Sequence, residues 1–158
     1  MVPVYADPQW PQTSIPVRRY RLFGPLCGFL EIPSLLRNFD YVTLLQSADY
    51  LTSSLSEVMQ AYRLAVFNVL AGNRDDHSKN FAFLYDEFKG RYTLAPAYDF
   101  TYAPLIPEHH MTCFGNGRPA EDDLLRLAEK MNIPAHKAKE SIRKTKEIVR
   151  QQLNQWMD

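Results

Sequence analysis

The polar segment of residues 72–80 holds the side chains best suited to chemistry. It places an arginine, two aspartates, a histidine, a lysine and two asparagines between an apolar stretch and an aromatic-rich one. A carboxylate such as that of Asp75 can accept a proton from a hydroxyl group. Carboxylate and amide oxygens, as in Asp75 and Asn80, are also the ligands that hard cations prefer. The alternative is an ordinary surface turn, because Asn, Asp and Ser side chains readily bond to nearby backbone.

The spacing of these residues favours the chemical interpretation. Asp75 and Asn80 are separated by four residues, as in the H-R-D-x-x-x-x-N catalytic loop of protein kinases, where the aspartate accepts the hydroxyl proton and the asparagine holds magnesium. Downstream, Asp99-Phe100 stands where a kinase has the D-F-G aspartate that binds the metal, although Thr101 replaces the glycine. The two matches together predict a hard-cation site made by Asp75, Asn80 and Asp99.

Four other polar residues each allow a chemical and an architectural interpretation. His77 could orient the loop by hydrogen bonding, and Lys79 could steady a phosphate or the transferring group; for each, the alternative is a purely architectural role. The adjacent pair His109-His110 is not expected to bind a metal, because neighbouring side chains rarely converge on one ion.

The elements that must position these residues follow from periodicity and turn signals. Residues 40–45 predict a short helix that closes before Leu51. Ser54 and Glu57 match a capping box at the start of a second, largely buried helix that ends at Gly72. Residues 81–85 and 91–94 flank a polar, glycine-containing turn and predict a β-hairpin. Two further helices are expected, one beginning near residue 119 and one at residue 134, the latter with the inner stripe Ala138, Ile142, Thr145, Val149, Leu153 and Trp156.

The first third of the chain is irregular in composition. Prolines prevent long helices from starting there, so at most short strands are expected around residues 17–23. Six of the eleven prolines fall in this part: Pro3, Pro8, Pro11, Pro16, Pro25 and Pro33. Residues 1–16 are therefore predicted to be an irregular proline-rich segment, and residues 17–158 a single lobe. Its predicted class is α+β, predominantly α-helical, with one small hairpin beside the polar loop.

Composition excludes several classes of protein. Apolar residues make up 46% of the 158, enough for a core, and 18 Lys and Arg balance 18 Asp and Glu, which argues against general nucleic-acid binding. The last helix mixes its basic residues with acidic ones, so direct DNA binding is not expected. Cys27 and Cys113 are expected to be free thiols. No apolar run is long enough to span a membrane and no signal peptide is evident, so a cytoplasmic location is expected.

The sequence around the polar loop resembles the HipA family, the serine/threonine kinase toxins of bacterial toxin–antitoxin systems. That family's pattern is N-x-D-x-H-x-K-N followed by P-x-Y-D. The chain carries every letter of it, at Asn73, Asp75, His77, Lys79, Asn80, Pro96, Tyr98 and Asp99. The resemblance implies a kinase C-terminal lobe that uses ATP and Mg²⁺, with Asp75 as catalytic base, Asn80 and Asp99 as magnesium ligands, and His77 and Lys79 in the catalytic loop.

The nucleotide-binding lobe of a kinase has no counterpart here. There is no G-x-G-x-x-G, and no lysine precedes Lys79. The chain is therefore expected to be inactive alone and to need an N-terminal lobe. Met1 is either an internal start in a longer chain or the true start of a split system with a separately encoded N-terminal lobe. The resemblance further implies a helix-turn-helix (HipB-like) antitoxin as partner and a protein substrate such as a translation factor or an aminoacyl-tRNA synthetase. The alternative is a non-catalytic interaction module that binds an antitoxin or a related kinase.

Overall fold

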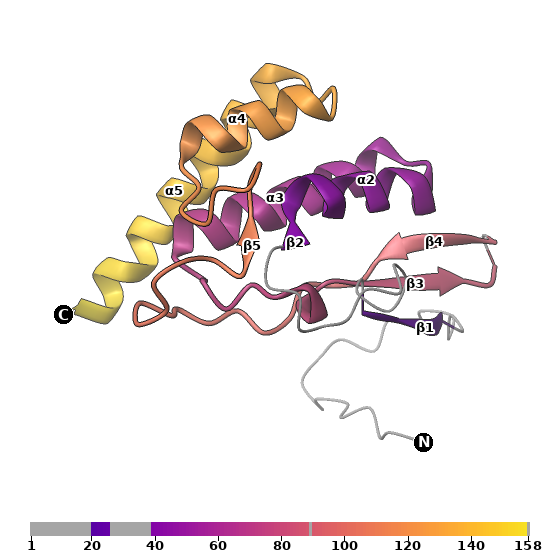
Figure 1. Cartoon of the computed structure of the whole chain (residues 1–158), viewed down its shortest axis with the longest axis horizontal. Helices are drawn as coiled ribbons and strands as arrows, with labels where there is room; N and C mark the ends of the chain where they lie inside the picture. The colour runs from indigo at the N-terminus through magenta and orange to yellow at the C-terminus, as the bar shows by residue number, and fades with distance from the viewer. Residues whose placement is uncertain (1–19, 26–38, 89, 158) are drawn as a thin grey trace.

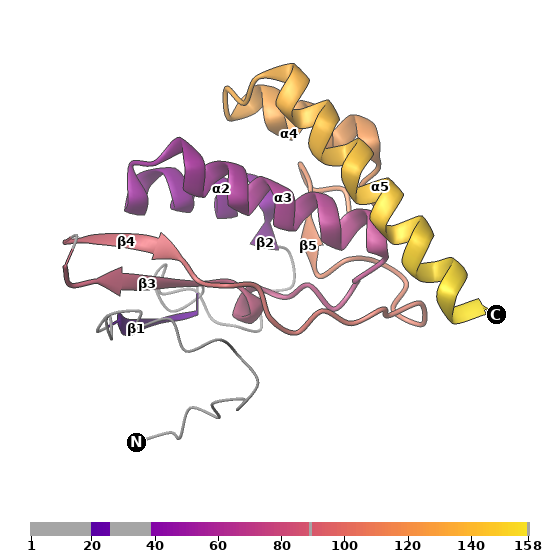
Figure 2. The same cartoon turned by 180° about the vertical axis from the view of Figure 1, so that it is seen from behind.

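Helices cover one face of a small sheet and extend beyond it (Figure 1). The computed structural model of the chain describes residues 20–25, 39–88 and 90–157. Helices α2 (Tyr41–Thr52) and α3 (Leu55–Ala71) lie over the sheet, and α4 (Glu121–Lys130) and α5 (Ala135–Met157) continue the helical layer past its edge. Figure 2 shows from behind that α5 crosses the end of α3. The predicted α+β, mainly helical class is confirmed.

The sheet has three strands in the order β1-β3-β4. The predicted hairpin is present as β3 (Ala82–Asp86) and β4 (Arg91–Leu94). Strand β1 (Tyr20–Pro25) pairs antiparallel with β3, with Tyr20 opposite Asp86. The short strand expected near residues 17–23 is therefore found within the described residues, and it makes the sheet one strand larger than the hairpin alone. The expected segment 1–16 lies outside the described residues.

A second, two-stranded sheet joins the start of α2 to a segment far along the chain. Strand β2 (Phe39–Asp40) runs parallel to β5 (Met111–Thr112). Asp40 is the N-cap of α2: its Oδ1 accepts the Val42 N–H at 2.8 Å, and its Oδ2 accepts the Gly115 N–H at 2.9 Å. One carboxylate thus starts the helix and holds the loop after β5.

Helix α2 is longer than its sequence pattern predicts. The expectation that it closes before Leu51 was wrong, because it continues to Thr52 and ends at Ser53, which adopts a left-handed conformation with φ of 47°. The reason is burial: the buried positions of the helix include Ala48 and Thr52, and the Thr52 hydroxyl donates to the Ala48 carbonyl at 2.6 Å. Packing against α3 holds the last turn in place.

The predicted capping box at the start of α3 does not form. Ser54 is the N-cap, but its side chain makes no capping hydrogen bond, and its N–H donates to the Thr52 hydroxyl at 3.2 Å. Glu57 instead accepts the N–H of Leu94, at the end of β4, at 2.8 Å. Ser54 and Glu57 stand at capping-box spacing. However, the Thr52 hydroxyl takes the Ser54 N–H that Glu57 would accept in a capping box, and the Glu57 carboxylate accepts from strand β4 instead.

Gly72 ends α3 as predicted and turns the chain into the polar loop. Its φ is +68°, a conformation that glycine adopts at little cost, and its N–H donates to the Asn68 carbonyl. A Cβ at this position would lie 3.2 Å from Cε2 of Tyr102. Glycine therefore lets the segment after Asp99 pass close to the end of α3.

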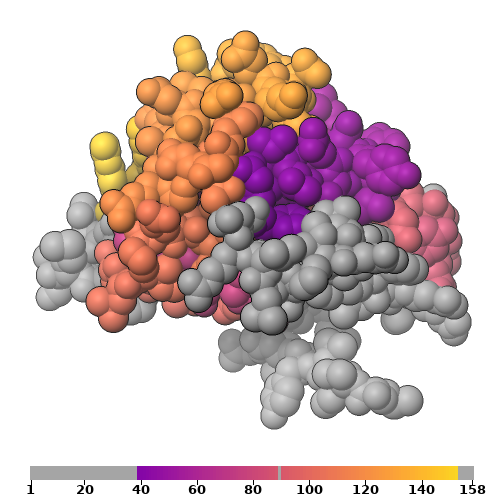
Figure 3. All heavy atoms as spheres, viewed as in Figure 1, coloured from indigo at the N-terminus to yellow at the C-terminus, as the bar shows by residue number. Residues whose placement is uncertain are grey.

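The last two helices begin close to where they are predicted. The N–H of Ala120, the residue before α4, donates to the Asp123 carboxylate at 2.9 Å. On α5, Ala138 and Ile142 are buried, as expected for the predicted inner stripe of this helix. The structure does not describe the side chains of Leu153 and Trp156. Figure 3 shows α4 and α2 side by side on one face of the molecule.

The hydrophobic core of the described residues is a cluster of apolar side chains that come mainly from the helices and from strands β3 and β4. It includes the fully buried Tyr41, Tyr62 and Phe83. The Cys113 thiol is free and buried, and burial raises its pKa to about 12, so it is unreactive near neutral pH; Cys27 lies outside the described residues. Within the described ranges, no helix is both long and apolar enough to cross a membrane.

Candidate functional site

The polar loop turns some of its side chains inward and others outward. Asn73 and Asp76 are buried, Asp75 and Asn80 are half-buried, and Lys79 is exposed. The loop ends in one 3-10 turn, Ser78–Asn80, before β3. The inward residues fasten the loop, and the outward ones are accessible for chemistry.

Asp76 is the buried fastening point of the loop. Its carboxylate is fully buried and accepts the Tyr41 hydroxyl at 2.5 Å and the Met111 N–H at 3.1 Å, and His109 Nδ1 lies 2.8 Å from it. Burial, followed by the charge of Asp76, raises the pKa of Tyr41 well above its ordinary value. Tyr41 therefore stays protonated and donates to the carboxylate. The sequence analysis did not identify Asp76 or its partners.

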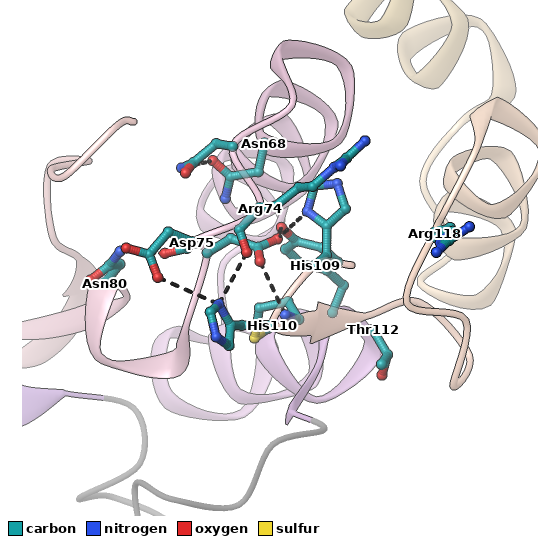
Figure 4. A network of polar contacts seen from close by, with 12 residues as sticks. Asn68, Arg74, Asp75, Asn80, His109, His110, Thr112 and Arg118 are labelled. Atoms are coloured by element: carbon teal, nitrogen blue, oxygen red, sulfur yellow. Dashed lines mark hydrogen bonds and ion pairs between the residues drawn. The ribbon is translucent and has the colours of Figure 1, made fainter. Parts of the chain in front are cut away.

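The two adjacent histidines reach two different carboxylates (Figure 4). His109 Nδ1 contacts the Asp76 carboxylate. His110 Nδ1 lies 3.0 Å from the Arg74 carbonyl oxygen and 3.4 Å from Oδ1 of Asp75. The backbone N–H of His110 also donates to the Arg74 carbonyl at 3.2 Å. Residues 109–111, hereafter the 109–111 tripeptide, thus run alongside Arg74, Asp75 and Asp76.

Arg74 fastens the loop to the segment that follows Asp99. Its Nη1 donates to the carbonyls of Ile106 at 2.8 Å and Pro104 at 3.4 Å. Arg74 has the position of the arginine in the H-R-D pattern, and in this chain its guanidinium group donates to backbone carbonyls. Its role here is structural.

Asp75 and Asn80 contact each other through one hydrogen bond. The side-chain N–H of Asn80 donates to the backbone carbonyl of Asp75 at 3.1 Å. This contact uses the amide nitrogen of Asn80 and leaves its Oδ1 as the atom that could face a cation. The Asp75 side chain is 43% exposed, and among the described residues only its Oδ1 has a polar partner.

The segment around Asp99 packs against the same loop. The Tyr98 hydroxyl donates to the Lys79 carbonyl at 2.5 Å, and Tyr98 and Phe100 line a small cavity together with Asn80. Asp99 itself is exposed and has a φ of +58°, which is uncommon outside glycine. Strain of this kind costs of order 1–3 kcal/mol and is found at functional sites. The fold therefore packs the two neighbours of Asp99, Tyr98 and Phe100, against the loop and holds Asp99 itself in an unusual backbone conformation.

His77 and Lys79 are placed differently from each other. His77 Nδ1 is buried without a hydrogen-bond partner among the described residues, and its ring centroid lies 6.2 Å from that of His110. The Lys79 side chain is exposed, with no ion pair to any described residue. Lys79 is free to meet an anion, whereas His77 lines the interior side of the loop.

The donor set fits magnesium held together with a substrate. The described part of the chain contains no group of three or more His, Cys, Asp or Glu residues placed to hold a metal. Magnesium in phosphoryl-transfer sites is commonly held by one or two carboxylates, with phosphates and water completing the shell. The Asp99 carboxylate and the Asn80 amide oxygen are ligands of that type.

Comparison with known proteins gives one family and one fold. The family model described as HipA-like C-terminal domain matches residues 15–153. A chain in the solved complex of the toxin–antitoxin system HipA, HipB and its operator DNA from Shewanella oneidensis MR-1 has the same fold, with a TM-score of 0.60 and 17% identity. The alignment covers 71% of this chain and 28% of that chain. No curated protein sequence matches.

The family match extends over most of the chain and includes both halves of the candidate site. The motif of residues 73–80 and Asp99 all lie inside the matched range. The structural similarity independently supports the fold. The chain therefore belongs to the family of HipA-like C-terminal domains.

Proposed function

We propose that the chain is the catalytic lobe of a HipA-type protein serine/threonine kinase of a toxin–antitoxin system, which transfers phosphate from ATP with Mg²⁺ once an N-terminal lobe is supplied. The observation that carries this proposal is the contact of Asp75 with Asn80, together with the packing of residues 98–100 against the same loop. Asp75, Asn80 and Asp99 also follow one another along the chain in the order of a kinase catalytic loop and its metal-binding aspartate, which supports the proposal.

Asp75 is proposed to act as the catalytic base. Its Oδ2 has no partner among the described residues, and its side chain is accessible, so a serine or threonine hydroxyl can approach this oxygen. A carboxylate at this place orients the hydroxyl and accepts its proton as the phosphorus–oxygen bond forms. The hydrogen bond from Asn80 fixes the backbone from which the Asp75 side chain projects.

Asn80 and Asp99 are proposed to hold the magnesium ion, and the ammonium group of Lys79 to attract phosphate oxygens. When bound, the ion neutralises charge on the transferring phosphoryl group. The chain offers one carboxylate and one amide oxygen for the ion, so its affinity for Mg²⁺·ATP alone is expected to be weak. An N-terminal lobe would add further phosphate contacts.

The partners follow from the same proposal. The chain spans 28% of the HipA-system chain it resembles, so the activity of a whole kinase needs more than these residues. We infer a HipB-like helix-turn-helix antitoxin, an N-terminal lobe, and a protein substrate such as a translation factor or an aminoacyl-tRNA synthetase. All of them would meet the chain in the cytoplasm.

The proposal is tested by reconstitution. The chain is mixed with the N-terminal lobe of a HipA-type kinase and Mg²⁺·ATP, and radiolabelled γ-phosphate in protein serine or threonine is measured. We expect transfer that needs the chain, the lobe and Mg²⁺ together, and negligible transfer by the chain alone. Robust transfer by the chain alone would contradict the need for the lobe, and absence of transfer in the complete mixture would contradict the kinase proposal.

A groove between α3 and α5 favours a second candidate, a non-catalytic module that binds an antitoxin or a related kinase. The groove has a volume of about 850 Å³, and its lining includes Leu55, Met59, Phe67 and Ile148 with Arg63 and Lys144. Leu55 and Ile148 are more than half exposed. An apolar groove of this kind can bind a partner without any use of Asp75. The reconstitution separates the two candidates, because a module would not support transfer.

A further inference from the structure

The surroundings of His110 Nδ1 determine that this ring nitrogen carries a hydrogen. Nδ1 of the ring faces two oxygens, the Arg74 carbonyl at 3.0 Å and Asp75 Oδ1 at 3.4 Å. A carbonyl oxygen and a carboxylate oxygen are both acceptors, so Nδ1 must carry the hydrogen. The 3.0 Å contact with the Arg74 carbonyl is a hydrogen bond of ordinary length. At 3.4 Å, the same N–H attracts Oδ1 of Asp75 more weakly and favours one orientation of that carboxylate.

The backbone that carries the ring is held in place by hydrogen bonds of residues 109–111. The backbone N–H of His110 donates to the Arg74 carbonyl. On either side, His109 and the Met111 N–H contact the two oxygens of the buried Asp76. Because the 109–111 tripeptide is fastened beside the loop, the backbone from which the His110 ring projects has a fixed position next to Asp75 (Figure 4).

We propose that His110 is a positioning residue for Asp75, an inference that rests on the proposed kinase function. Its Nδ1–H holds Oδ1 of Asp75 and thereby turns Oδ2 toward the acceptor hydroxyl. Asn80 holds the backbone carbonyl of the same residue, so Asp75 is restrained at the main chain and at the side chain. His110 touches neither substrate nor phosphate; it acts through Asp75.

The effect of losing this restraint can be estimated. Without the His110 Nδ1–H, the Asp75 carboxylate can adopt other side-chain rotamers. A catalytic group in the wrong position can lower the rate by about 100-fold. Removing the Nδ1–H is therefore expected to lower turnover by roughly 10- to 100-fold. The KM for the protein substrate should change little, because His110 does not contact it.

Two replacements separate positioning from general support of the fold. The side-chain amide nitrogen of Asn can occupy the place of Nδ1, whereas that of Gln reaches the place of Nε2. In the reconstituted kinase, His110→Asn is expected to keep turnover within about threefold of wild type, and His110→Gln to lose roughly 10- to 100-fold. Equal turnover in both variants, whether high or low, would overturn the positioning role.

A second measurement needs no kinase activity. Nitrogen-15 NMR of the His110 ring in the full chain, at a pH where the ring is neutral, should show the Nδ1–H tautomer; an Nε2–H tautomer would overturn the inference. Absence of transfer by the wild-type reconstitution would count against the proposed function, and with it against a catalytic effect of His110. Normal wild-type transfer with unchanged turnover in His110→Gln would count against His110 alone.

Discussion

Replacement of Asp76 by alanine is expected to lower the free energy of unfolding by about 3–5 kcal/mol, the range seen when one partner of a buried charged network is removed. The variant leaves the Tyr41 hydroxyl, the His109 ring and the Met111 N–H without their common acceptor in a fully buried place. Domains of this size are stable by only about 5–15 kcal/mol. Urea denaturation followed by circular dichroism measures the difference.

Asp75→Ala provides the matched control, one residue away. The Asp75 side chain is 43% exposed and its partner His110 is 38% exposed, so the loss should stay below about 1 kcal/mol. A stability of Asp76→Ala equal to that of Asp75→Ala would contradict the role assigned to Asp76. Replacement of Asp76 is thus expected to affect mainly stability, and replacement of the adjacent Asp75 mainly activity.

Replacement of Asp75 by asparagine is expected to lower phosphoryl transfer in the reconstituted kinase by roughly 10²–10⁴-fold, the usual contribution of a general base. Asparagine has nearly the same shape and can still face His110, but it cannot accept the hydroxyl proton. Transfer to a protein serine or threonine is measured with Mg²⁺·ATP at saturation.

Two controls define this result. Asp122→Asn changes an exposed acid in the first turn of α4, away from the loop, and should leave transfer unchanged. Thermal unfolding of Asp75→Asn should match wild type, so that lost transfer cannot come from lost folding. Transfer by Asp75→Asn within a few fold of wild type would contradict the assignment of Asp75 as the base.

The parts of the fold that were predictable are those governed by local patterns. Helix α3 follows from apolar residues at steps of three and four, and it ends at Gly72 because glycine accepts a positive φ. The β3–β4 hairpin follows from two aromatic-rich runs around a glycine-containing turn. The contact of Asp75 with Asn80 is also local, since one short turn closes it.

The parts that were missed depend on contacts between distant residues. Tyr41 and Asp76 are 35 residues apart, and Asp76 and His109 are 33 apart. Nothing in the local sequence says which of two adjacent aspartates is buried. The dipeptide His109-His110 was noticed only as an improbable metal pair, although its two rings serve two carboxylates. The capping box failed for the same reason, since Glu57 meets Leu94, which is 37 residues away.

The measurement that tests the central claim most directly is binding of Mg²⁺·ATP by the chain, followed by amide NMR of Asn80 and Asp99. The account predicts weak binding that shifts both signals, is lost in Asp99→Asn and is retained in Asp122→Asn. Binding in the millimolar range corresponds to about 4 kcal/mol, which suits a site lacking its second lobe. Absence of shifts at Asn80 and Asp99, or equal shifts in Asp99→Asn, would contradict a metal–phosphate site in this lobe.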